Sequence, residues 1–145
     1  MRAIYAKSPD DEKIIQKEIR RIARSLQAKP PQVIFWFHGD GKYEQDEQAI
    51  YLPNSEWWKT YEPDLEGERY WLLVIHELAH YLDDVLHNHV GHDGDYYSIV
   101  VALGMKIGIG LDRLHHYEKE YKPMAWKRGT MRAAGRLLES HKEKR

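Results

Sequence analysis

The hydrophobic pattern at the start of the chain predicts a helix followed by a small sheet. Ser8 can cap the helix, Pro9 suits its first position, and Pro30-Pro31 predicts its end. Two β-rich runs then predict strands over residues 33–37 and 49–52, and the pattern gives no position for a third strand. The apolar positions of the helix recur every three or four residues: Ile15, Ile19, Ile22 and Leu26.

The rest of the chain is predicted to be helical. A short helix is expected over 54–61, and residues 66–86 are apolar on nearly every side, which is typical of a central, buried helix that ends near Asn88 and Gly91. Further helices are expected around 96–108 and, rich in basic residues, over 123–141. The fold class is therefore α+β. One domain is expected over 1–145, with its core at about 30–110, in which a small sheet packs on the central buried helix with flanking helices.

The composition excludes several classes of protein. The chain has 145 residues and no cysteine, so a disulfide framework, a cysteine nucleophile and a Cys-ligated zinc ribbon are ruled out. No apolar run approaches ~18 residues, and residues 1–10 contain no apolar signal region. Neither a membrane span nor a secretory signal is expected, and a cytoplasmic protein is the resulting prediction.

Charge is unevenly distributed along the chain, although the net charge is only −1. Residues 1–30 carry a net charge of +4, residues 31–118 carry −11, and residues 119–145 carry +6. An acidic middle suits a cation site, and basic ends suit contacts with anions. Solvated helix faces are the simpler explanation of the two ends.

Histidines are concentrated in one segment, because five of the nine fall between His76 and His92. Residues 76–80 are His-Glu-Leu-Ala-His, inside the predicted buried helix. Residues four apart share a helical face, so His76 and His80 can direct both imidazoles at one ion, and Glu77 can reach a water bound to it. Zinc fits best, because a catalytic zinc site combines three protein ligands with one open position. Two structural histidines are the alternative, but burying three titratable groups without a partner would be costly.

The third ligand is expected from beyond His80. His87 lies roughly 10 Å farther along the same helix, which is too far, and it is expected at the surface near the helix end. Asp84, about one turn beyond His80, is better suited to supporting a ligand than to binding the ion. His89 and His92 both follow the predicted turn, and spacing alone leaves both open.

The motif at 76–80, followed by Gly91-His92-Asp93-Gly94-Asp95-Tyr96, resembles the SprT-like (SprT/Spartan) zinc metallopeptidase domain over about residues 30–110. The resemblance implies a zincin-like fold, with Zn²⁺ held by His76, His80 and His92. It also implies a protein or peptide substrate and places Tyr96 at an aromatic position of the motif. Asp93 stands where the family usually has Gly, Asp95 stands where Glu is common, and the family's frequent Cys-rich ribbon is missing.

The chemistry expected of this motif is peptide hydrolysis. Zinc would activate a water, and Glu77 would act as general base and then deliver the proton to the leaving amine. Resemblance to zincins suggests that the substrate lies along a strand, here residues 49–52. Proteins bound to DNA are an expected substrate of the family, and the basic C-terminal region could contact DNA through Lys119, Lys122, Lys127, Arg128, Arg132 and Arg136. Tyr96 and Tyr97 are expected in the core or in the wall of the site.

Two other functions compete with this one. An ImmA/IrrE-like peptidase, which cleaves a repressor, also carries HExxH on a helix, but its third ligand is usually an acid on the following helix. A non-catalytic metal-binding adaptor domain would need the two histidines for stability but would not need Glu77.

Overall fold

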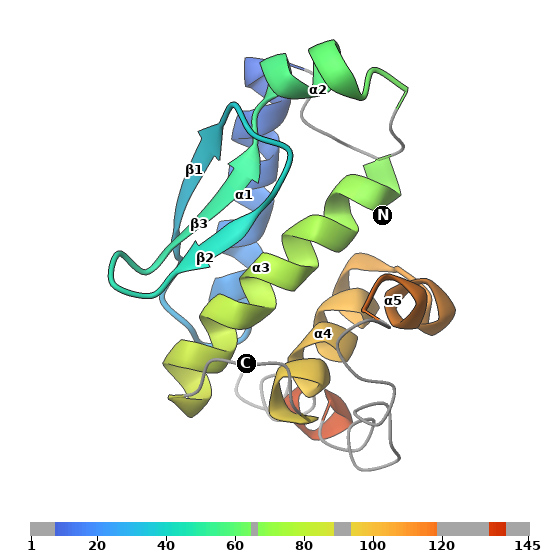
Figure 1. The fold of residues 1–145 in the computed structure, drawn as a ribbon. Coiled ribbons are helices and arrows are strands. Elements are labelled where there is room, and N and C mark those ends of the chain that lie inside the picture. The colour runs from blue at the N-terminus through green and yellow to red at the C-terminus, as the bar shows by residue number, and fades with distance from the viewer. Residues whose placement is uncertain (1–7, 65–66, 89–93, 119–133, 139–145) are drawn as a thin grey trace.

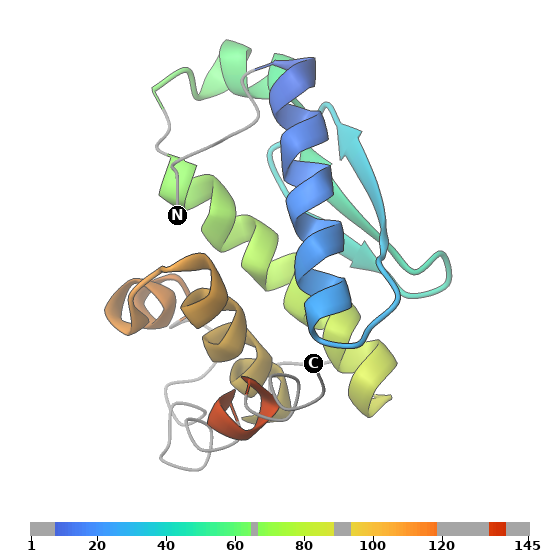
Figure 2. The ribbon, with the colours of Figure 1, turned by 180° about the vertical axis from the view of Figure 1, so that it is seen from behind.

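A central helix divides the fold into two parts. A computed structural model of the chain describes residues 8–64, 67–88, 94–118 and 134–138. Helix α3 (Gly67–His87) lies between the sheet with α1 (Pro9–Ser25) on one side and α4 (Gly94–Ile107) with α5 (Leu111–Glu118) on the other (Figure 1, Figure 2). The predicted α+β class and the central buried helix are confirmed.

Helix α1 and the short helix after the sheet each begin at a capping side chain. Ser8 Oγ accepts a hydrogen bond from the Asp11 backbone N–H at 3.2 Å, which caps α1. Asn54 Oδ1 accepts from the Trp57 N–H at 2.9 Å and starts α2 (Ser55–Tyr61) in the same way. Helix α1 ends earlier than the prolines predict, because Gln27 adopts a left-handed conformation with φ of 62°.

The sheet has three strands in the order β1-β3-β2. The two predicted strands are β1 (Gln32–Trp36) and β3 (Ala49–Pro53), which run parallel. The third, β2 (Lys42–Glu44), pairs antiparallel with β3 in a segment that the sequence indicates as a turn. Strand β3 is central and paired on both sides, so the expectation that residues 49–52 bind an extended substrate is wrong.

Helix α3 is buried along most of its circumference. Thirteen of its 21 residues are buried, which explains why its sequence shows no polar face. Its apolar side chains meet the inner face of the sheet and the stripe of α1 in one core, together with those of α4. The core residues that join these elements include Ile19, Ile50, Leu52, Leu78, Leu82 and Val100.

The C-terminal part contains a helix that the pattern did not predict. Helix α5 follows Gly110, and Leu114 packs so closely on Gly104 that a Cβ there would lie 2.3 Å from its Cδ1. Residues 134–138 are helical, and the remainder of the basic helix predicted over 123–141 lies outside the described residues. Within the described part of the chain, no helix combines the length and apolar character needed to cross a membrane.

Candidate metal centre

The HExxH motif occupies the middle of α3, where it is shielded from solvent. His76 and Glu77 are only 8% and 6% exposed, and His80 is half-buried. The His76 and His80 ring centroids lie 5.0 Å apart, with their planes at 80°. The prediction that the i, i+4 spacing places both imidazoles side by side is confirmed.

Tyr96 of α4 contacts both histidines where α4 packs on α3. Its hydroxyl lies 2.9 Å from His76 Nδ1 and donates to the His76 backbone oxygen at 3.1 Å. Its ring lies 4.5 Å from that of His80, at 31°. Tyr96 and Tyr97 are fully buried, so their predicted place in the core is confirmed. Burial also leaves Tyr96 less suited to binding an oxyanion of a substrate.

Glu77 faces the loop that joins β1 to β2. This loop, residues 37–41, crosses the end of β3, and its last residue Gly41 lies directly against the Glu77 side chain. A Cβ at Gly41 would lie 2.9 Å from Glu77 Cγ and 3.2 Å from Oε2. A side chain at this position would force Glu77 or the loop to shift, so glycine lets the loop approach the general-base candidate closely.

Asp84 has a different role from the one expected. Its carboxylate accepts hydrogen bonds from the Tyr43 hydroxyl and, at 3.3 Å, from Gln45 Nε2. Burial, followed by the hydrogen bond to Asp84, raises the pKa of Tyr43 above its ordinary value, so the phenol stays protonated and keeps donating. Asp84 therefore fastens β2 to α3, and this contact positions the strand along the helix that carries the motif.

His87 is engaged elsewhere, as its distance from the motif predicts. Its Nδ1 lies 2.8 Å from Oδ1 of Asp83, which is completely buried, while His87 itself is exposed in the last turn of α3. Asn88, with φ of 53°, ends the helix as predicted.

The third-ligand candidates His89 and His92 both lie outside the described residues. Within residues 8–64, 67–88, 94–118 and 134–138, no three His, Cys, Asp or Glu side chains form a group that could hold a metal ion. The two candidates follow α3 in the sequence, between its last residue and the start of α4. Helix α4, which carries Tyr96, begins at Gly94, two residues after His92 in the sequence.

Sequence reasoning missed two contributors to this site, Gly41 and the hydroxyl of Tyr96. Gly41 had a signal, because Gly39-Asp40-Gly41 indicates a tight approach as well as a turn. The contact of Tyr96 with His76 spans 20 residues and follows from the packing of α4 on α3, which no local pattern encodes.

Comparison with known proteins adds no relative: no protein-family model matches the chain, and no curated protein or solved structure is significantly similar to it.

Proposed function

We propose that this protein is a zinc-dependent metallopeptidase that hydrolyses peptide bonds, with a zincin-like site formed by His76, His80 and His92. The observation that carries the proposal is the arrangement on α3, where two adjacent imidazoles share a site with a buried glutamate. Two imidazoles and a carboxylate gathered on one buried helix are the side-chain types that a catalytic zinc site uses as ligands and general base.

Glu77 performs the proton transfers in this scheme. Its carboxylate accepts a proton from the attacking water and passes it to the amine that leaves. Gly41 lies against the Glu77 side chain, and burial limits the contact of the carboxylate with bulk water. When bound, zinc supplies Lewis acidity, which lowers the pKa of water and polarises the scissile carbonyl.

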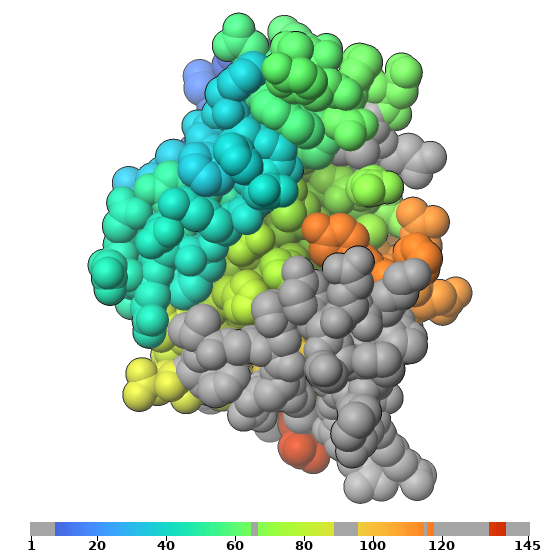
Figure 3. Space-filling view, in the orientation of Figure 1, coloured from blue at the N-terminus to red at the C-terminus, as the bar shows by residue number. Residues whose placement is uncertain are grey.

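The substrate is proposed to lie along β2, which replaces β3 in this role. Strand β2 is at the edge of the sheet, and among the described residues no strand pairs with its outer side, where an extended peptide could add. Gly41 at its start touches Glu77, and Tyr43 within it reaches Asp84, so the strand follows α3 past the motif. Figure 3 shows part of α3 at the surface between the sheet and α5, beside this edge.

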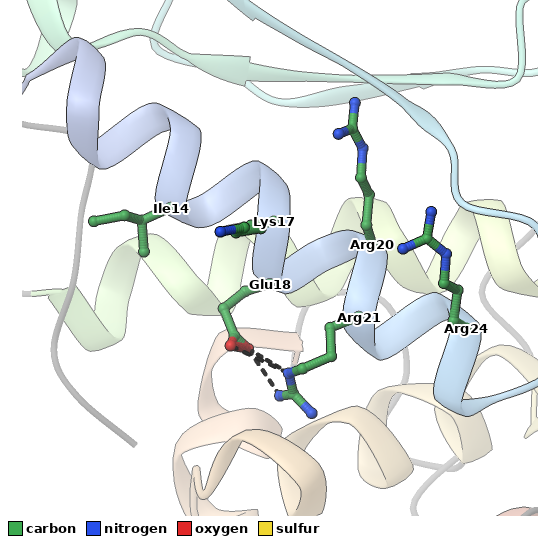
Figure 4. Close-up of a pocket in the computed structure, with 6 residues that line it drawn as sticks. All are labelled: Ile14, Lys17, Glu18, Arg20, Arg21 and Arg24. Atoms are coloured by element: carbon green, nitrogen blue, oxygen red, sulfur yellow. Dashed lines mark hydrogen bonds and ion pairs between the residues drawn. The ribbon is translucent and has the colours of Figure 1, made fainter.

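Contact with DNA is proposed to involve basic side chains outside the motif. Most of the C-terminal cations named above lie outside the described residues, and Arg136 is exposed. The basic surface that is described belongs to α1, where Lys17, Arg20, Arg21 and Arg24 line a hollow of about 580 Å³ and Glu18 pairs with Arg21 at 2.8 Å (Figure 4). Nucleic acid would bind such cations through its phosphates, so retention on single-stranded DNA should fall with salt. Absence of retention at low salt would contradict the proposed binding of DNA.

The test of the proposed function is Glu77→Gln, assayed for hydrolysis of an unfolded protein in the presence of zinc. The amide keeps the shape of the side chain but cannot take the proton, so turnover should fall at least 100-fold, about the contribution of a general base, with zinc content unchanged. Glu56→Gln, at an exposed position of α2, is the matched control and should retain full activity. Full activity of Glu77→Gln would remove the general-base role.

Zinc content and hydrolysis, measured together, separate the two competing functions. A non-catalytic adaptor would bind zinc without any hydrolysis in the wild type. An ImmA/IrrE-like peptidase would take an acid from the following helix, and Asp95 in the first turn of α4 is the only acid in that helix. Loss of zinc from Asp95→Asn, with zinc retained by His92→Ala, would favour that alternative.

A further inference from the structure

The hydroxyl of Tyr96 contacts two atoms of one residue, and this geometry determines which atom holds which proton. It lies 3.1 Å from the backbone oxygen of His76 and 2.9 Å from Nδ1 of the same residue. A carbonyl oxygen can only accept, and a phenol has a single proton to donate. The hydroxyl therefore donates to the carbonyl and accepts a hydrogen bond from Nδ1–H of the imidazole.

This assignment leaves the other ring nitrogen as the basic one. In a neutral imidazole with its proton on Nδ1, the lone pair is on Nε2. The phenol ring also lies 4.5 Å from the imidazole of His80, at an angle of 31°, so it limits how far this second ring can turn. One fully buried side chain thus restrains both histidines.

We infer that Tyr96 is a positioning residue that fixes the Nδ1–H tautomer and the orientation of His76, so that Nε2 is presented to a divalent metal. The inference rests on the proposed function only where it concerns the metal. Histidine ligands usually donate their second N–H to a carboxylate, a backbone carbonyl or water. Here the Tyr96 hydroxyl takes that place, and it donates in turn to the backbone oxygen of His76. Helix α4 therefore helps to fix the orientation of the imidazole.

The first experiment reads the tautomer directly, in the metal-free wild type. Ring nitrogen chemical shifts of His76 should report a proton on Nδ1 at about pH 8, above the ordinary histidine pKa of about 6.5. In Tyr96→Phe the acceptor for Nδ1–H is lost, and the shifts should move toward the Nε2–H tautomer. Wild-type shifts that place the proton on Nε2, or shifts unchanged by Tyr96→Phe, would overturn the inference.

The second experiment measures zinc affinity by competition with a chelating dye. Tyr96→Phe should bind zinc about 10- to 100-fold more weakly, as is typical when the partner of a ligand is removed. Tyr70→Phe is the matched control, because its buried hydroxyl also donates to a backbone oxygen, that of Pro53 at 3.1 Å. It should bind zinc as the wild type does. Equal affinities in the wild type and both variants would contradict the positioning role.

The two experiments also separate this inference from the proposed function. If the wild type binds no zinc at all, the metallopeptidase proposal fails, and the ring nitrogen shifts still decide whether Tyr96 sets the tautomer. Thermal unfolding of both variants confirms that each is folded, and a change of tautomer confined to Tyr96→Phe is not expected from a loss of packing alone.

Discussion

Gly41 and Glu77 lie in direct contact, although they are 36 residues apart and belong to a loop and a helix. A Cβ at Gly41 would approach Cγ of Glu77 to 2.9 Å and Oε2 to 3.2 Å. The contact joins the start of the edge strand β2 to the side chain proposed as general base. A glycine at the end of this loop lets its backbone approach the helix without displacing Glu77.

Gly41→Ala is predicted to impair turnover more than binding of the metal. The added methyl group displaces the Glu77 carboxylate, and a displacement of this kind can reduce turnover tenfold to about 100-fold. Zinc content should stay that of the wild type, because the added methyl group lies against Glu77, which is not one of the proposed ligands. Gly110→Ala is the control, since a Cβ there meets nothing within 4 Å. Equal turnover in both variants would show that the contact is not needed.

Tyr43→Phe is predicted to loosen the edge strand. It removes the hydrogen bond to Asp84, which should lower the free energy of unfolding by about 1 kcal/mol. If peptide binds along β2, the Michaelis constant should rise more than the turnover number falls. Tyr51→Phe loses an exposed hydrogen bond to Glu47 instead and should leave the Michaelis constant and the turnover number unchanged. A Michaelis constant that is the same in wild type and Tyr43→Phe would argue against substrate binding on this strand.

The stability of the protein should decline at alkaline pH. Burial is the main cause that raises the pKa of Tyr43, Tyr70 and Tyr81 above their ordinary value, and Asp84 adds to the effect at Tyr43 and Tyr81. The folded chain therefore keeps these protons at a pH where the unfolded chain releases them. Their contribution to stability is complete below about pH 10 and is lost as the pH rises beyond it.

Urea unfolding between about pH 8 and pH 11.5 measures this decline. Tyr70→Phe removes one of the three titrating groups, so its free energy of unfolding should fall less steeply with pH than that of the wild type. A stability that stays constant or increases over this range would contradict the assignment.

The sequence predicts those parts of the fold whose signals are local. Helix α1 follows from Ser8, Pro9 and an apolar stripe, and the shared face of His76 and His80 follows from the helical repeat. Strand β2 has no such signal, because Lys-Tyr-Glu lacks an apolar pattern and is held by pairing with β3 and by Tyr43 on Asp84. Helix α5 depends on Leu114 packing on Gly104. Gly108 and Gly110, just before it, indicate the end of a helix and not the start of another.

The order of the strands was also beyond the pattern. Strands at 33–37 and 49–52 are evident in the sequence, but which of them becomes the central strand depends on which one β2 pairs with. The same holds for the site, since the motif on α3 is visible in the sequence whereas Gly41 and Tyr96 reach it only through tertiary packing.

The most direct test of the metallopeptidase proposal is the zinc content of the purified chain after zinc loading and desalting, measured by elemental analysis beside His92→Ala and His89→Ala. The wild type and His89→Ala should each hold one zinc ion per chain, because the proposed site uses His76, His80 and His92. His92→Ala should hold none. A wild type without zinc, or a full complement in His92→Ala, would contradict this assignment of the ligands.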